Sequence, residues 1–82
     1  MSKSYFLRLF RRYMGTTPYN YLVNFRITQA KELLVLTDHS VSEIAQEVGF
    51  GDASNFSTRF AKATGQSPLQ YRKNALKSAA QR

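Results

Sequence analysis

Apolar residues recur at helical spacing between residues 40 and 49 and predict a short amphipathic helix there. Its apolar face is formed by Val41, Ile44, Ala45 and Val48. Ser40 and Glu43 form a capping box at its start, in which the hydroxyl and the carboxylate each accept from an unpaired backbone amide. Gly49 supplies the left-handed residue that ends a helix. We therefore expect a helix that begins near Val41 and stops at Gly49.

A second amphipathic helix follows a short turn and begins after Asp52, which offers another cap. Its apolar stripe is formed by Phe56, Phe60 and Ala63, and Gly65 ends it. The small Ala45 lies where the two helices must approach closely. Two short helices joined by a tight glycine turn are typical of a helix-turn-helix. An ordinary helical hairpin in a core shows the same spacing, so the rest of the chain must decide.

Residues 4–22 repeat the pattern of residues 54–72 without a gap. The coincident pairs are Ser4 and Ser54, Phe6 and Phe56, Phe10 and Phe60, Gly15 and Gly65, Pro18 and Pro68, and Tyr21 and Tyr71. Each pair has a structural role: the phenylalanines anchor a helix, the glycine ends it, and the proline takes the first position of the next. The repeat predicts that the two segments share one architecture.

A long helix is predicted from Pro18 to about Leu36, because no Gly or Pro interrupts the segment after its first position. Its broad apolar face is formed by Tyr21, Leu22, Phe25, Ile27, Ala30, Leu33 and Leu34. A helix of about 19 residues spans roughly 28 Å. That length is close to the roughly 34 Å between successive major grooves on one side of B-DNA. We expect this rod to hold two reading helices about one turn of duplex apart, or simply to be the core helix of a small bundle.

Charge is distributed in three blocks along the 82 residues, with a net charge of +7. Six basic residues come first: Lys3, Arg8, Arg11, Arg12, Arg26 and Lys31. Five acidic residues follow: Glu32, Asp38, Glu43, Glu47 and Asp52. Six further basic residues complete the chain: Arg59, Lys62, Arg72, Lys73, Lys77 and Arg82. This order predicts two surfaces that hold a polyanion and a third surface turned away from it.

Composition argues against several other classes of protein. The chain has no Cys, and no apolar run approaches the roughly 20 residues of a membrane span. His39 is the single imidazole, and it lies in a predicted turn without the orienting partner and pocket of a catalytic base. We therefore expect no enzyme, no metal site and no cofactor, and a soluble protein of the cytoplasm.

Four segments carry a resemblance to a known family. They are SKSYFLRLFRRYMGTTPYNYL (residues 2–22), RITQAKELL (26–34), VSEIAQEVGFGDASNFSTRF (41–60), and KATGQSP with the following YR (62–72). The chain resembles the DNA-binding domain of the AraC/XylS family of bacterial transcription regulators through these segments, which cover nearly all of residues 2–73. Residues 2–22 resemble that family's first recognition helix and the start of its linker helix.

The resemblance implies an all-α, homeodomain-like fold with two helix-turn-helix units, each placing one helix in the major groove of double-stranded DNA. About one and a half helices precede this starting point in the family, so the first unit is expected to be incomplete. Its helix would then repack on the linker helix, be disordered, or borrow a neighbouring chain. The expected parts are an incomplete first unit (2–17), a linker helix (18–37), a second unit (38–66), a C-terminal helix (67–77) and a frayed tail (78–82).

The second recognition helix presents a small, polar outward face opposite Phe56 and Phe60, at about 100° per residue. Ser54 and Thr58 project outward on this wheel. Family correspondence places the base contacts at Ala53, Ser54, Ser57 and Thr58. Phosphate contacts are assigned to Asn55, Arg59, Lys62, Arg72 and Lys73.

The first recognition helix presents Arg8 directly opposite Phe6 and Phe10. Arg8 is the expected guanine reader, because an arginine can contact O6 and N7 of guanine together, and Leu7 is placed for a thymine methyl. The base-reading set of this helix is Ser4, Leu7 and Arg8, and its phosphate set is Lys3, Arg11 and Arg12.

Double-stranded DNA is the expected partner, with RNA polymerase as a further candidate through the acidic middle of the chain. The family usually carries a separate sensing or dimerising domain, and we expect that domain to be absent from this chain. Two alternative functions stay open. The segregated arginines of residues 2–15 are typical of a cationic amphipathic helix on a membrane, and the positive charge would also suit RNA.

Overall fold

The computed structural model describes residues 2–80, and all regular secondary structure in that range is α-helical. The helices are α1 (Lys3–Met14), α2 (Pro18–Leu36), α3 (Val41–Glu47), α4 (Ala53–Thr64) and α5 (Pro68–Ala80). The all-α prediction is confirmed. Helix α5 runs to Ala80, beyond the expected end at residue 77, so residues 78–80 are helical, whereas the rest of the predicted tail lies outside the described residues.

The capping box predicted at the start of α3 is present. The Ser40 hydroxyl accepts from the Glu43 backbone N–H at 3.1 Å, and the Glu43 carboxylate accepts from the Ser40 backbone N–H at 3.2 Å. The hydrogen bond from the Ser40 backbone N–H to the carboxylate, followed by the Ser40 side chain, lowers the pKa of Glu43, because both favour the ionised carboxylate. At the start of α4, Asp52 caps the helix by accepting from the Ser54 backbone N–H at 2.8 Å.

The sequence repeat corresponds to a repeated junction between helices. Helices α1 and α4 both end at a glycine in the left-handed region, with φ of 75° at Gly15 and 80° at Gly65. The next helix is capped by Thr17 in the first copy and by Ser67 in the second, whose side chains accept from amides three residues ahead. The two copies therefore turn the chain in the same way.

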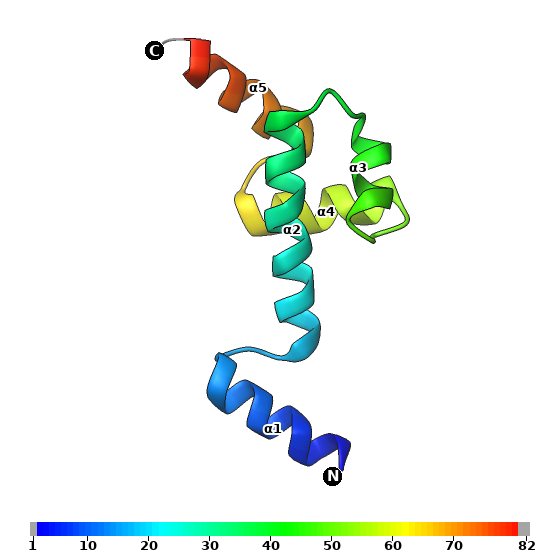
Figure 1. Cartoon of the computed structure of the whole chain (residues 1–82), viewed down its shortest axis with the longest axis vertical. Helices are drawn as coiled ribbons and strands as arrows, with labels where there is room; N and C mark the ends of the chain where they lie inside the picture. The colour runs from blue at the N-terminus through cyan, green and yellow to red at the C-terminus, as the bar shows by residue number, and fades with distance from the viewer. Residues whose placement is uncertain (1, 81–82) are drawn as a thin grey trace.

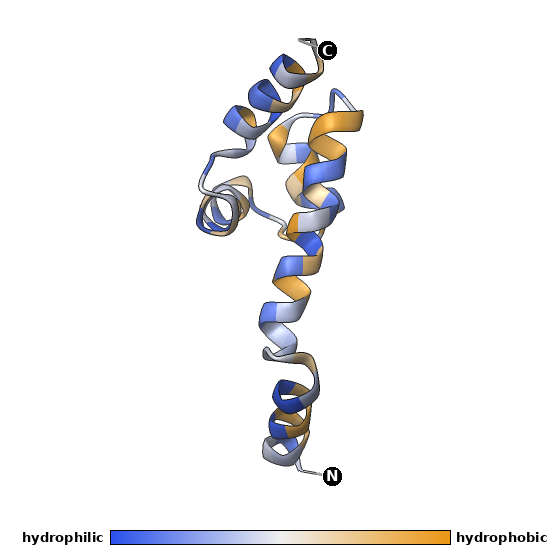
Figure 2. Cartoon of the chain, turned by 90° about the vertical axis from the view of Figure 1, so that its left-hand side faces the viewer, coloured by the Kyte–Doolittle hydropathy of each residue, from blue (hydrophilic) through white to orange (hydrophobic). Residues whose placement is uncertain are grey.

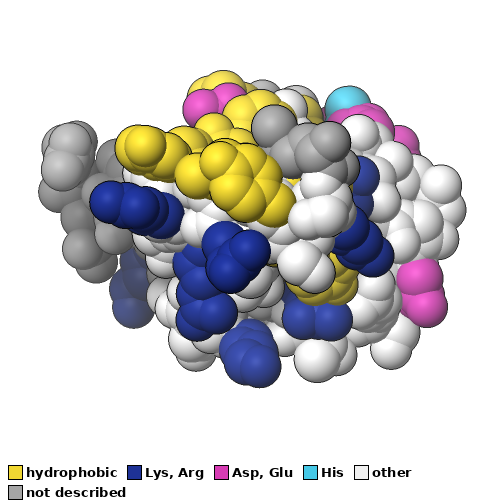
Figure 3. Space-filling model, turned by 90° about the horizontal axis from the view of Figure 1, so that it is seen from below, with side chains coloured by type: hydrophobic (Ala, Val, Ile, Leu, Met, Phe, Trp, Pro, Cys, Tyr) yellow, Lys and Arg dark blue, Asp and Glu magenta, His cyan; other side chains and the backbone are white. Residues whose placement is uncertain are grey.

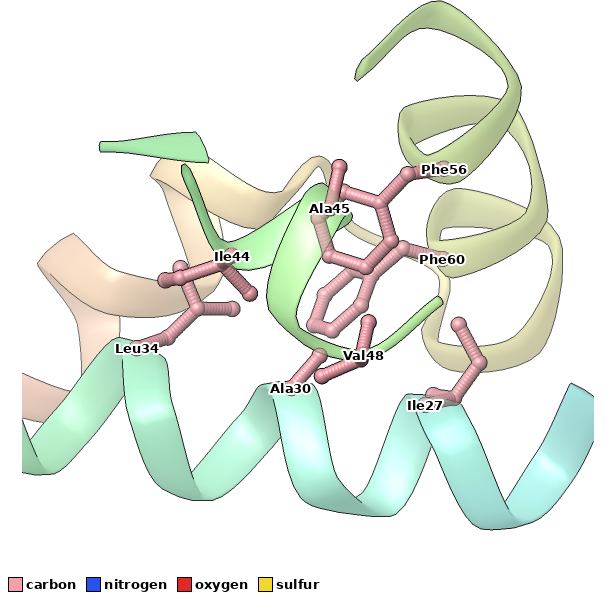
Figure 4. Packing of buried hydrophobic residues seen from close by; sticks show 8 residues of the cluster. All are labelled: Ile27, Ala30, Leu34, Ile44, Ala45, Val48, Phe56 and Phe60. Carbon is pink, nitrogen blue, oxygen red and sulfur yellow. The ribbon is translucent and has the colours of Figure 1, made fainter. Parts of the chain in front are cut away.

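The core lies where α2, α3 and α4 meet, and Figure 4 shows its side chains pointing toward one another from the three helices. It consists of Ile27, Ala30, Leu34, Ile44, Ala45, Val48, Phe56 and Phe60. Ala30 and Ala45 are fully buried, as close approach of the helices requires. The Phe60 ring also meets Tyr71 of α5 edge to face, with ring centroids 5.4 Å apart. Ala63, expected on the apolar stripe of α4, is exposed.

The first half of α2 leaves its large apolar side chains at the surface. Tyr21, Leu22 and Phe25 are 47%, 42% and 53% exposed. The expectation of one broad buried face along α2 is therefore wrong for this half. At about 100° per residue these three side chains lie on the side of α2 opposite the core residues Ile27, Ala30 and Leu34. Helix α1 contacts this half of α2 through Phe10. The Phe10 ring packs edge to face on the Tyr21 ring, with centroids 5.8 Å apart.

The molecule is elongated, with principal extents of 51 × 27 × 18 Å. Helix α1 lies at one end of α2, whereas α4 crosses the middle of α2 (Figure 1). The separation of α1 and α4 along the linker is therefore shorter than the full length of α2. Figure 2 shows hydrophilic and hydrophobic residues on opposite sides of α1.

Candidate nucleic-acid interface

The outward face of α4 is small and polar, as the helical wheel predicts. Phe56 and Phe60 are completely buried, while Ser54 and Thr58 are exposed on the opposite side. The Thr58 hydroxyl donates to the Ser54 carbonyl oxygen at 3.0 Å, so its proton is used while its oxygen can still accept. Of the other residues expected to contact DNA from α4, Ala53, Ser57 and Arg59 are half-buried and Asn55 and Lys62 are exposed.

The turn between α3 and α4 is fixed by backbone and side-chain hydrogen bonds. The Phe50 backbone N–H donates to the Ala45 carbonyl at 2.9 Å, and the Gln46 side chain donates to the Gly51 carbonyl at 3.0 Å. Gly49 has φ of 96°, and a Cβ there would lie 3.1 Å from the Arg26 guanidinium carbon. Arg26 of α2 thus lies directly against the turn, a contact that sequence reasoning missed. The turn sets the angle at which α4 leaves α3.

The basic face of α1 is fully presented to solvent. The residues expected to contact DNA from this helix are all exposed: Lys3, Ser4, Leu7, Arg8, Arg11 and Arg12. Its apolar side is only partly covered, since Phe6 remains 47% exposed and α1 contains no buried residue. The sequence left three possibilities for this helix: packing on the linker helix, disorder, or packing on a neighbouring chain. The structure agrees with the first in part, because α1 packs on α2 but leaves much of its apolar side exposed. The Phe10 ring contacts Tyr21 of α2, and α1 is helical from Lys3 to Met14.

Positive charge gathers on one end of the molecule. Figure 3 looks at the end where α1 lies and shows Lys and Arg side chains over much of the lower half of the view, with acidic side chains at its margins. A protein surface of this kind attracts a polyanion over distances of about one Debye length.

A polar cleft lies between the first half of α2 and the C-terminal half of α4. Its volume is about 340 Å³, and it is lined by Thr16, Asn20, Val23, Asn24, Arg59, Lys62 and Ala63. The Arg59 guanidinium lies 5.6 Å from the centroid of the Tyr19 ring, a cation–π contact that fixes its position beside the cleft. Arg59 and Lys62 were expected from the sequence, whereas Asn20 and Asn24 were not. Asn20 and Asn24 are four residues apart and therefore lie on the same side of the long helix, a spacing that could have indicated a shared polar site.

Arg72 has a role that the sequence did not indicate. Its Nε donates to the Leu34 carbonyl at 2.9 Å, and its Nη2 donates to the carbonyls of Thr37 at 3.2 Å and His39 at 2.7 Å. These contacts satisfy backbone acceptors at the end of α2 and in the following turn. The guanidinium is therefore engaged inside the protein. Lys73, its neighbour, is exposed.

The acidic middle of the chain is partly used for local structure. His39 Nδ1 lies 2.8 Å from Glu47 Oε1, so the two can form a hydrogen bond when that nitrogen carries a proton. Glu43 is held by the capping box of α3. Among residues 2–80 there is no group of three or more metal-ligating side chains, and no helix has the length and apolarity needed to cross a membrane.

Comparison with known proteins agrees with this geometry. A family model described as a helix-turn-helix domain matches residues 1–74. The HTH-type transcriptional activators RhaS of Salmonella arizonae and of Salmonella paratyphi B are each 43% identical over 65 residues. That match covers 79% of this chain and 23% of theirs, so the chain spans about a quarter of the length of these relatives.

Two solved structures are similar along most of the chain. The C-terminal domain of AraT, a response regulator from Geobacillus stearothermophilus, is 38% identical with a TM-score of 0.87, and the match covers 90% of this chain and 61% of that one. The DNA-binding domain of AdpA, a global transcriptional factor solved in complex with a target DNA, is 36% identical with a TM-score of 0.86. That match covers 90% of this chain and 67% of the AdpA domain.

The fold and the exposed face of α4 define the class as a helix-turn-helix domain of DNA-binding transcription regulators. The chain belongs to the AraC/XylS family within that class.

Proposed function

We propose that this chain binds double-stranded DNA sequence-specifically, with α4 in one major groove and α1 in the neighbouring one. The observation that carries the proposal is the orientation of α4, which buries Phe56 and Phe60 completely and presents Ser54 and Thr58 to solvent. An α-helix fits the major groove, where each base pair shows a distinct pattern of donors and acceptors. The AdpA domain, which shares this fold, was solved with a target DNA.

The base-reading side chains are small on α4 and larger on α1. Helix α4 contributes Ala53, Ser54, Ser57 and Thr58, and α1 contributes Ser4, Leu7 and Arg8. On α1, Arg8 reads guanine through two hydrogen bonds, and Leu7 contacts a thymine methyl group. Short side chains let the α4 backbone approach the bases closely.

The phosphate contacts come from the charged and amide groups that flank these faces. They are Lys3, Arg11, Arg12, Asn55, Arg59, Lys62 and Lys73. We leave Arg72 out of this set, because its Nε and Nη2 already donate to three backbone carbonyls. Phosphate contacts of this kind set the register of a protein on DNA, while base contacts set its sequence preference.

Binding to duplexes recovered by in vitro selection tests the proposal. Arg8→Ala and Thr58→Ala should each reduce the preference for the selected duplex over a scrambled one, by about 5- to 150-fold for Arg8. Thr28→Ala is the matched control for Thr58, since Thr28 is also exposed and donates to the carbonyl four residues earlier at 3.0 Å. Lys77→Ala, at the other end of the molecule, matches the lost charge of Arg8→Ala. An unchanged preference in both reading variants would reject the proposal.

Salt dependence separates DNA from the alternative partners. For duplex DNA the logarithm of affinity should fall by about 0.9 per phosphate contact per logarithmic unit of salt. Single-stranded RNA and anionic vesicles should bind more weakly at the same ionic strength. Tighter binding to RNA or to vesicles would favour an RNA-binding or membrane-binding function over DNA binding.

The role within a whole regulator follows from the longer relatives. We propose that a sensing or dimerising domain works with this DNA-binding domain, as the RhaS activators are about four times longer than the matched segment. RNA polymerase is a further candidate partner through the acidic surface. Glu32 is its most available contact, because Glu43 and Glu47 are engaged locally. This role places the protein with the nucleoid in the bacterial cytoplasm and involves no catalysis.

A further inference from the structure

We propose that the cleft between α2 and α4 holds a phosphodiester of the DNA stretch that joins the two major grooves, so that the linker helix is itself a DNA-binding element. The residues that take this role beyond those already assigned are Asn20 and Asn24 of α2, with Thr16 at its approach. This inference rests on the proposed DNA binding, which it deepens by adding a third contact region between the two reading helices.

The cleft has the chemistry of a phosphate site. Its polar lining consists of two cations, Arg59 and Lys62, two carboxamides, Asn20 and Asn24, and the Thr16 hydroxyl, with no carboxylate. All of these groups can donate a hydrogen bond, and phosphate oxygens only accept. Within the described residues, the carboxamides of Asn20 and Asn24 have no hydrogen-bonding partner, so their donors are free for a ligand.

One of the cations is held in place before any ligand arrives. The Arg59 guanidinium stacks on Tyr19 at 5.6 Å and is half-buried, which restricts its rotamers. Tyr19 and Asn20 are consecutive residues of α2, so the helix that carries the carboxamides also fixes the arginine. Fixed donors lose less conformational freedom on binding than flexible ones.

The position of the cleft matches the path of the DNA backbone. Thr16, Asn20 and Asn24 lie on the approach to α2 and in its first half, between α1 at its start and α4 across its middle (Figure 1). Two successive major grooves on one side of a duplex are separated by a minor groove and the phosphates that border it. A duplex that receives α1 and α4 therefore presents these phosphates to this half of α2.

The decisive variant removes both carboxamides. Asn20→Ala together with Asn24→Ala should weaken binding about tenfold, equally for a selected and a scrambled duplex, because phosphate contacts are blind to sequence. The slope of log affinity against log salt concentration should stay unchanged in this double variant, since neither side chain is charged. Lys62→Gln should reduce that slope by about 0.9. Gln29→Ala, an exposed carboxamide of α2 outside the cleft, is the matched control and should bind like the parent chain.

A variant that introduces a negative charge separates a loss of DNA binding from an effect on folding. Asn20 is the third residue of α2, where an aspartate is favourable to the helix N-terminus. Asn20→Asp should therefore keep or raise the melting temperature while weakening duplex binding more than Asn20→Ala does. A fall in affinity that simply tracks a fall in melting temperature would overturn the inference.

Side-chain amide signals distinguish the source of the phosphate. In ¹H–¹⁵N spectra, the Asn20 and Asn24 amide groups should shift on adding duplex DNA and stay in place with inorganic phosphate at the same ionic strength. If the preference lost in Arg8→Ala and Thr58→Ala shows DNA reading while the double asparagine variant binds like the parent, this inference fails and the proposed function stands. If the reading variants lose nothing, the proposed function itself fails.

Discussion

The guanidinium of Arg72 in α5 closes the end of α2, with its Nε 2.9 Å from the carbonyl oxygen of Leu34. The two residues are 38 positions apart in the sequence, and the contact joins the last helix to the linker helix. Two more carbonyls of the following turn accept from the same side chain. Arg72 therefore stabilises the junction at which α2 gives way to the helix-turn-helix.

Replacing this arginine should destabilise the whole domain. Arg72→Ala leaves three backbone carbonyls without their donor, and we expect a loss of about 2–3 kcal/mol in the free energy of unfolding. For a domain of this size the melting temperature should fall by roughly 10–20 °C. Arg72→Lys should recover little, because an ammonium cannot reproduce the fork of the guanidinium. Lys73→Ala, next to it and exposed, should change stability by less than about 0.5 kcal/mol.

The two glycines of the α3–α4 turn should differ in their tolerance of a methyl group. Both have positive φ, at 96° for Gly49 and 71° for Gly51, but only Gly49 has the Arg26 guanidinium close by. Gly51→Ala should cost about 1–2 kcal/mol from backbone strain, and Gly49→Ala should cost more because it also displaces Arg26. Chemical denaturation of the two variants measures the difference. Equal losses of stability in the two variants would show that the Arg26 side chain moves aside at no cost.

Helix α1 should open far more easily than the rest of the chain. It contains no buried residue, and short isolated helices are marginal in water. Amide hydrogens of α1 should therefore exchange rapidly, while those around Phe60 approach the protection of global unfolding. Phe60→Ala should cost about 3–5 kcal/mol and Phe10→Ala under about 1. Strong protection across α1 would mean that it packs more firmly than Phe10 and Tyr21 alone allow.

The capping box of α3 should make stability depend on acid. Hydrogen bonds from the Ser40 backbone and side chain lower the pKa of Glu43 below its usual 4.5. The carboxylate therefore contributes stability that is fully present above pH 4.5 and is lost as the pH falls through the lower pKa of the folded state. In Glu43→Gln, melting temperature should fall less steeply between about pH 5 and 3 than in the parent. The same slope in both would show that Glu43 is not part of this acid response.

Features set by neighbouring residues could be predicted from the sequence. The capping box of Ser40 and Glu43, the glycine ends of α1 and α4, and the outward direction of Ser54 and Thr58 all depend on local spacing. Each was found where the pattern placed it. The family resemblance then supplied the meaning of the exposed face of α4, which spacing alone could not.

Features set by the packing of distant segments could not be predicted. The closure of α2 by Arg72 and the cleft that brings Asn20 beside Arg59 depend on how α4 and α5 lie against α2. Helical periodicity along α2 assigned Phe25 to a broad buried face, but periodicity does not say which side of a helix has a neighbour. Phe25 lies about 200° around α2 from the core residue Ile27, so its side chain is 53% exposed.

The central claim is that α4 and α1 each read a major groove on one side of a duplex. Dimethyl sulphate interference at guanine N7, on duplexes from in vitro selection, tests it most directly. We predict two interfered segments about 10–10.5 base pairs apart, one lost in Arg8→Ala and the other lost when Ser54 and Thr58 are both changed to Ala. Interference that is unchanged by both variants, or confined to a single groove, would contradict the claim.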